Sequence, residues 1–321
     1  MSRLPSLILA STLAAFVLPA TLLTPTPAAA ADSKAAVSLP RDVEASWRQQ
    51  AEKGDASAQY KLGLAYHIGF NAGGPDYAQA FNWFKKAAEK GHAEAMFKIG
   101  EMHARGQGRP RNPAEAYAWN MKSAAKGYPH AEYFAYVYLL TGTGTTKDEK
   151  KAMEWLQKAA THGWANAQYR LGRYYDSGAG FSKDSEKALA WIRKAAAQNH
   201  PGALGYLGMN LLEEAEATDD YREAVRVLTA GADLGDLTAQ MFLGTLYLTG
   251  MGVTQNHVSA CTWLTLASMA PAESVEDKRI QEKAREMLDE IREGLDADEI
   301  QAANLRAAQW IVERKASRAE R

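Results

Sequence analysis

The sequence predicts an all-α protein, and more specifically a right-handed α-solenoid of stacked helix-turn-helix repeats. Tryptophan recurs every 36 residues at Trp83, Trp119, Trp155 and Trp191, and again after a double interval at Trp263. An alanine precedes each of these positions by three residues, and a second series of alanines keeps the same register. Two series in one register, at a period of this length, indicate stacked supersecondary units that share a continuous core.

Each unit is expected to contain two helices. In the fourth unit, Ala167 and Leu171 are four residues apart, and Ala188 and Trp191 are three apart, so each pair shares one face of a helix. Between the two pairs lies Gly178-Ala179-Gly180, which allows the chain to reverse direction. Each unit is therefore predicted to be a helical hairpin, with tryptophan filling the space between neighbouring hairpins.

Glycine has two predicted roles in these hairpins. At the ends of helices it supplies the left-handed backbone conformation, for which asparagine is the best substitute. Inside the first helix of a unit, its recurrence indicates a close approach between helices, because glycine otherwise costs about 1 kcal/mol against alanine. The closing positions are Gly54, Gly91, Gly127, Gly163, Asn199 and Gly235, and the interior positions are Gly63, Gly100, Gly172, Gly208 and Gly244.

The repeated pattern also resembles a known family. A-x-x-x-L-G-x-x-Y-x-x-G-x-G, followed by K-A-x-x-W-x-x-K-A-A-x-x-G, is similar to the Sel-like repeat (SLR) family of the tetratricopeptide superfamily. The resemblance covers six units over 56–270. The fifth unit departs from the pattern, because Val227 replaces tryptophan and Glu213–Glu216 replaces the Gly-x-Gly break. The resemblance implies an exported bacterial protein that binds other proteins as an adaptor or regulator.

Both ends of the chain differ from the repeats. Residues 1–31 have the pattern of a cleavable signal peptide, with Arg3, an apolar stretch and small residues at Ala28–Ala31, so the mature protein is expected to be periplasmic or secreted and to have no membrane span. The predicted segments are a signal peptide at 1–31, a flexible leader at 32–40, a capping half-repeat at 41–55, six repeats at 56–270 and capping helices at 271–321.

The sequence predicts no catalytic, cofactor or metal site. A net charge of −1 gives no electrostatic footprint for nucleic acid. The glycine-rich Gly142–Lys147 lacks the ending of a phosphate-binding loop, and Cys261 is expected to be buried. Three of the seven histidines are placed near helix C-termini, where the helix dipole favours positive charge. These three are His92, His162 and His200.

One surface is predicted to bind a protein partner. On the first helices, the positions opposite the alanine framework change character from unit to unit and include basic and aromatic side chains, which interfaces favour. The candidate residues are Lys61, Lys98, Glu101, Phe134, Arg170, Arg173, Tyr206, Met209 and Phe242. The acidic run 213–220 is interpreted either as a solvated loop or as a docking point for a basic partner.

The function favoured by these observations is a non-enzymatic protein-binding scaffold in the bacterial cell envelope. One alternative is a factor that binds cell-wall material or polysaccharide. An enzymatic version of that alternative follows from a cysteine-rich branch of the family, which is associated with penicillin binding and hydrolysis. That branch carries paired cysteines in each repeat, whereas this chain has a single cysteine.

Overall fold

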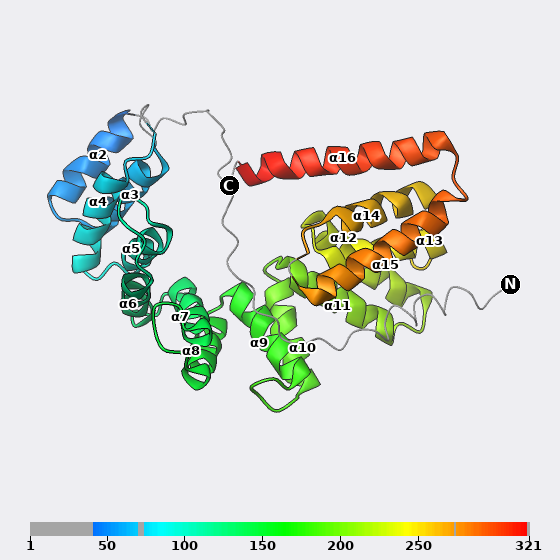
Figure 1. The fold of residues 1–321 in the computed structure, drawn as a ribbon, viewed down its shortest axis with the longest axis horizontal. Coiled ribbons are helices and arrows are strands. Elements are labelled where there is room, and N and C mark those ends of the chain that lie inside the picture. Colours follow the sequence, from blue (N-terminus) through cyan, green and yellow to red (C-terminus); the bar gives the residue numbers. More distant parts are fainter. Residues whose placement is uncertain (1–40, 70–73, 273, 320–321) are drawn as a thin grey trace. The chain divides into compact units, whose positions relative to one another are not determined.

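The computed structural model describes residues 41–69, 74–272 and 274–319. In these ranges the chain forms fifteen α-helices, labelled α2 to α16 in Figure 1. The helices are α2 (Arg41–Glu52), α3 (Ala56–Ile68), α4 (Tyr77–Glu89), α5 (Ala93–Arg105), α6 (Pro113–Ala124), α7 (Pro129–Thr141), α8 (Glu149–Thr161), α9 (Ala165–Ser177), α10 (Ser185–Ala196), α11 (Pro201–Glu214), α12 (Thr218–Asp233), α13 (Leu237–Thr249), α14 (His257–Met269), α15 (Val275–Arg292) and α16 (Ala297–Ala319). The predicted all-α class is confirmed, whereas the predicted signal peptide and leader lie outside the described residues.

The chain divides into two compact units. We call Asp32–Gln168 the N-terminal unit and Tyr169–Arg321 the C-terminal unit. In the N-terminal unit, α3/α4, α5/α6 and α7/α8 form consecutive hairpins, and α2 packs against α3 (Figure 1). In the C-terminal unit, α11/α12 and α13/α14 form hairpins of the same kind. Paired helices therefore repeat along both units, as the 36-residue period predicts.

Left-handed residues stand at the predicted closing positions. Gly163 has φ 91°, and Asn199 has φ 57°, the one positive φ of a non-glycine residue in the described ranges. Asparagine tolerates this conformation better than other residues with a Cβ atom. The second helix of each hairpin therefore ends where the sequence predicts.

The interior glycines mark close contacts between the two helices of a hairpin. A Cβ atom at Gly172 would stand 2.6 Å from Cγ1 of Ile192, and one at Gly208 would stand 2.5 Å from the Leu228 side chain. Equivalent contacts place Gly63 under Phe84, Gly100 under Asn120 and Gly244 under Leu264. The predicted close approach is confirmed, because a side chain of the second helix occupies the space that a Cβ atom at each glycine would need.

The tryptophan is not the most enclosed residue of a hairpin. The residue that follows the tryptophan is buried more deeply. Leu156, after Trp155, and Ile192, after Trp191, are both 0 % exposed. Trp155 is only partly buried, although it packs against a buried cluster that includes Ala131 and Ala135 of α7. The exposed part of the ring is covered by the lysine three residues later, and Lys158 Nζ lies 4.1 Å from the ring centroid of Trp155. Part of the tryptophan ring therefore packs on the core, and a lysine ammonium group covers the part that remains exposed.

The histidine positions differ from the sequence prediction. His92 and His200 precede α5 and α11, and each Nδ1 accepts a hydrogen bond from the backbone N–H three residues later, at 3.4 and 3.1 Å. A neutral imidazole can replace Asp or Ser as an N-cap, because its unprotonated nitrogen accepts one of the unpaired N–H groups. His162 does end α8, and its Nδ1 lies 2.7 Å from the buried Glu132 carboxylate.

The two C-terminal helices complete the core of the C-terminal unit. Helix α15 packs against α13 and α14, and α16 packs against α14. Cys261 is fully buried in this core, as predicted. None of the helices in the described ranges combines the length and the apolar character needed to cross a bilayer.

Candidate binding surface on the first helices

In the N-terminal unit, three of the predicted binding residues belong to an accessible, charged stripe. Lys61 on α3 is exposed, and its Nζ lies 5.8 Å from the Trp47 ring. One turn apart on α5, Lys98 Nζ contacts Glu101 Oε2 at 2.7 Å, and Arg105 approaches the other oxygen of Glu101 at 3.3 Å. These three residues together carry one net positive charge, because one carboxylate is shared by two cations.

Aromatic rings support this stripe from beneath. Phe134 on α7 is partly exposed, and its ring meets the buried Phe97 edge-on at 5.4 Å. Tyr128 stacks on His130 at 5.0 Å and also meets Phe97 at 5.5 Å. Burial raises the pKa of Tyr60, at the neighbouring position on α3, to about 12. The aromatic residues therefore form a packed base, in which Tyr60, Tyr128 and Phe134 each remain partly exposed.

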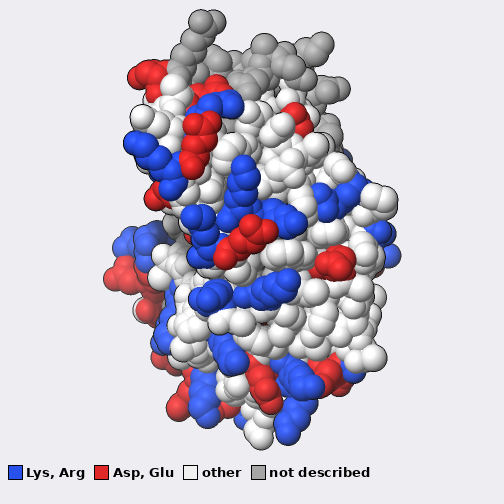
Figure 2. All heavy atoms as spheres, turned by 90° about the vertical axis from the view of Figure 1, so that its left-hand side faces the viewer, with Lys and Arg blue, Asp and Glu red and all other residues white. Residues whose placement is uncertain are grey.

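The N-terminal unit as a whole is basic. Residues 41–168 contain 17 Lys and Arg against 13 Asp and Glu, whereas residues 169–321 contain 18 against 24. Figure 2 views the left-hand side of Figure 1, and it shows Lys and Arg side chains gathered in bands across that face, with fewer Asp and Glu among them. The net charge of −1 for the full chain therefore combines a positively charged N-terminal unit with a negatively charged C-terminal unit. The positive potential of the N-terminal unit attracts acidic partners.

In the C-terminal unit, the predicted residues are engaged in contacts within the chain. Arg173 donates from Nη1 to the Tyr169 hydroxyl at 3.2 Å, and its guanidinium carbon lies 5.5 Å from the centroid of the Tyr206 ring. Burial, followed by the nearby Asp176 carboxylate, raises the pKa of Tyr206. Arg170 is partly buried on the same helix. These contacts hold the side chains in place and leave less of each for a partner.

Two predicted binding residues are core residues, and their assignment to the surface is wrong. Met209 is 9 % exposed and Phe242 is 0 % exposed. Both belong to the buried cluster that includes Ile280 and Met287 of α15, and the Thr245 hydroxyl lies 3.9 Å from Met287 Sδ. Helix α15 therefore covers the face of α13 on which a partner was expected, and a partner cannot reach Phe242 while α15 is in place.

The acidic run of the fifth unit is partly structural. Asp220 Oδ2 accepts hydrogen bonds from the backbone N–H groups of Glu216 and Ala217, which organises the start of α12. Glu213 ends near Asp176, and burial together with the like charges of Asp176 and Glu214 raises its pKa. The run is neither wholly solvated nor wholly free for docking, because it includes a turn that connects α11 to α12.

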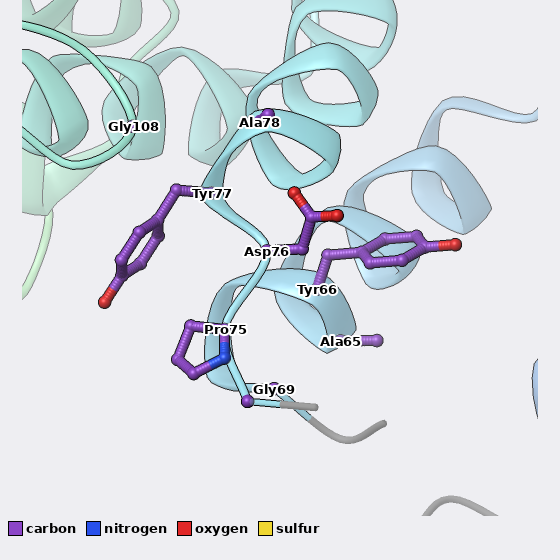
Figure 3. A pocket seen from close by; sticks show the side chains of 9 residues that line it. Ala65, Tyr66, Gly69, Pro75, Asp76, Tyr77, Ala78 and Gly108 are labelled. Carbon is purple, nitrogen blue, oxygen red and sulfur yellow. The ribbon is translucent and has the colours of Figure 1, made fainter. Parts of the chain in front are cut away.

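The largest pocket that we describe lies between α3 and the start of α4, with a volume of about 550 Å³ (Figure 3). Tyr66, Asp76 and Tyr77 line it, and Asp76 Oδ1 accepts a hydrogen bond from Gln79 N at 2.9 Å, so this carboxylate serves as a helix cap. In the described ranges, no group of three His, Cys, Asp or Glu side chains could hold a metal ion.

The contacts at this surface differ in how far the sequence alone predicts them. The Lys98–Glu101–Arg105 chain follows from spacings of three and four on a helix, so it could have been read from the sequence. The stacking of His92 on Tyr60 at 4.6 Å could not, because the two residues are 32 positions apart and belong to different hairpins. Its recurrence as His200 on Tyr169, also at 4.6 Å, becomes visible only with the fold in hand.

Comparison with protein families confirms the repeat. Sel1 repeats match residues 56–92, 93–128, 131–164, 165–200 and 237–271, which together exceed half of the chain. The chain belongs to the Sel1 repeat family. The matched ranges omit 201–236, the fifth unit, in which Val227 replaces the tryptophan. The protein is thus a helical repeat scaffold of the Sel1 type.

Solved structures are similar to this chain. A Sel1 repeat protein from Oxalobacter formigenes shares the fold and is 26% identical, with a TM-score of 0.60, over 76% of this chain and 71% of that chain. A protective antigen of uropathogenic Escherichia coli strains, described as displaying an SLR fold, is also 26% identical, with a TM-score of 0.46, over 84% of this chain and 71% of that chain.

A curated relative shares a shorter segment. The ERAD-associated E3 ubiquitin-protein ligase component HRD3A of Arabidopsis thaliana is 41% identical over 59 residues, which are 18% of this chain. The chain spans 9% of the length of that relative. This match is therefore limited to a short segment of both proteins.

Proposed function

We propose that this Sel1 repeat protein is an exported scaffold of the bacterial cell envelope that binds an acidic protein partner along the first helices of its N-terminal unit. The observation that carries the proposal is the accessible stripe of Lys61, Lys98, Glu101 and Arg105, with the partly exposed Phe134 beneath it, on a unit of net positive charge. Interfaces combine such aromatic anchors with charges that guide the partner's approach.

The proposed location depends on the first 31 residues, which have the composition of a cleavable signal peptide. Cleavage after the small residues would leave a mature chain that begins near Ala31 or Asp32. N-terminal sequencing of protein recovered from the periplasm tests this part of the proposal. A full-length chain that stays in the membrane fraction would contradict it, without affecting the proposed binding surface.

Photo-crosslinking tests the binding surface directly. We would place p-benzoylphenylalanine at position 61, on the proposed surface, and in a separate variant at position 85, an exposed lysine position on α4. The proposal predicts that an adduct with one acidic envelope protein forms at position 61 and not at position 85. Equal adducts at both positions would indicate non-specific contact and would contradict the assigned surface.

A further inference from the structure

A second recess lies in the C-terminal unit, between α14 and α16, and has a volume of about 300 Å³. It contains two tryptophans, Trp263 from α14 and Trp310 from α16, and both are partly exposed. Arg306 and Glu313 on α16 line it seven residues apart, which on a helix is about 10 Å. A space of this size fits a single side chain or a small molecule better than an extended segment.

The repeat itself shows what its tryptophan binds. In four units, the ammonium group of the lysine three residues after the tryptophan lies over the indole ring. The Nζ-to-centroid distances are 4.2 Å for Lys86 on Trp83, 3.8 Å for Lys122 on Trp119, 4.1 Å for Lys158 on Trp155 and 4.0 Å for Lys194 on Trp191. A cation at this distance is attracted by the negative face of the ring.

The sixth unit keeps the tryptophan and loses the lysine. The residue three positions after Trp263 is Leu266, which is buried and also lines the recess. The chain therefore supplies no lysine from this position to Trp263. Trp310 differs in this respect, because the Arg314 guanidinium lies 4.9 Å from its ring centroid.

The charges of the recess favour a cation at one end. Gln309 donates from Nε2 to Glu313 Oε1 at 2.8 Å, which orients this carboxylate beside the recess. Arg306 lines the recess one helical turn before Trp310 and repels a cation at its own end. A positively charged group would therefore be most stable beside Glu313, at a distance from Arg306 and from the Arg314 guanidinium on Trp310.

From this geometry we propose that the recess between α14 and α16 binds a lysine or arginine side chain presented by a partner protein, which takes the place over Trp263 that the chain's own lysine has in the other units. The site is separate from the first-helix surface of the N-terminal unit. A test of this recess is therefore independent of a test of the proposed function.

The test is an NMR titration of the full mature chain with small probes, followed through the indole N–H signals. Trp263→Phe and Trp310→Phe variants assign those two signals. The probes are N-acetyl-lysine methylamide, its uncharged analogue N-acetyl-norleucine methylamide, and N-acetylglucosamine. The proposal predicts that the lysine probe shifts the signals of Trp263 and Trp310 at concentrations where the other two do not.

Surface variants supply the second measurement. Glu313→Gln should weaken binding of the lysine probe by about 1.4-fold to fivefold, the range expected for an exposed charge pair, and Arg306→Gln should strengthen it. Glu290→Gln, an exposed position on α15, is the matched control and should leave the affinity unchanged. Equal binding of the lysine and norleucine probes would overturn the proposal in favour of an apolar recess. Tighter binding of N-acetylglucosamine would overturn it in favour of a sugar site.

Discussion

The histidine that begins α11 should make the stability of the C-terminal unit sensitive to acid. His200 Nδ1 accepts the hydrogen bond of Ala203 N at 3.1 Å, and its ring lies 4.6 Å from the Tyr169 ring. Burial, which outweighs a hydrogen bond to the backbone, lowers the pKa of His200 to about 4. A protonated imidazole has no lone pair at Nδ1, so acid removes both the cap and the neutral form that burial requires.

The size of the effect follows from the two pKa values. His200 has a pKa of about 4 in the folded chain, against about 6.5 when it is unfolded, so the unfolded chain takes up its proton first as the pH falls. The stability contributed by neutral His200 is fully present above about pH 6.5 and decreases as the pH falls to about 4. The full difference corresponds to about 3 kcal/mol.

A His200→Asn variant isolates the contribution of His200 to the pH dependence of stability, because asparagine caps helices without titrating. Parent and variant should differ by less than about 1 kcal/mol near pH 7.5, and the variant should be more stable by about 2 kcal/mol at pH 4.5. Urea unfolding followed by circular dichroism at each pH measures the difference. The comparison is needed because burial raises the pKa of Asp236 to about 7, so that Asp236 titrates in the same window with the opposite sign.

The control is His257→Asn, at an exposed position at the start of α14. It should reproduce the pH profile of the parent. Parallel profiles for the parent and His200→Asn would refute the reasoning, because they would mean that His200 binds its proton equally well in the folded and the unfolded chain.

Further predictions concern the hairpins. Leu156→Ala should cost about 2–5 kcal/mol because Leu156 is fully buried, and Trp155→Ala only about 2 kcal/mol because the ring is partly exposed. Urea midpoints in the reverse order would contradict the packing described for α8. Gly172→Ala should lower the melting temperature although alanine favours helices, because its Cβ atom would overlap Ile192 and cost about 1–3 kcal/mol. A stabilised Gly172→Ala would mean that the two helices can separate at no cost.

Much of the fold could be predicted because the residues that each turn and each helix contact require recur in several units. The glycines at 163 and 172 occur in a register shared by other units, so their roles as turn and contact residues were readable before any coordinates. Asn199 confirmed the turn role through its own left-handed backbone. Turns and helix contacts that recur in the same register are therefore the features that the sequence predicts best.

The exposed fraction of the first-helix residues was less predictable, because it depends on the helices that come after the repeats. Phe242 occupies the same position in its unit as the exposed Lys61, yet it is buried because α15 packs on that face. The sequence predicted capping helices at 271–321 but not that one of them packs on α13. In the same way, His92 and His200 were placed at helix ends, whereas their hydrogen bonds assign them to helix starts.

The most direct test of the proposed binding surface is the affinity of the crosslinked partner, measured by calorimetry. The double variant Lys61→Glu/Lys98→Gln changes the stripe, and Lys85→Glu/Lys126→Gln makes the same charge changes at exposed positions on or just after the second helices of the N-terminal unit. We expect the first variant to bind about tenfold more weakly, with a reduced salt dependence, and the second to bind like the parent. Equal affinities for the parent and a folded Lys61→Glu/Lys98→Gln variant would contradict the assignment and place the interface elsewhere on the chain.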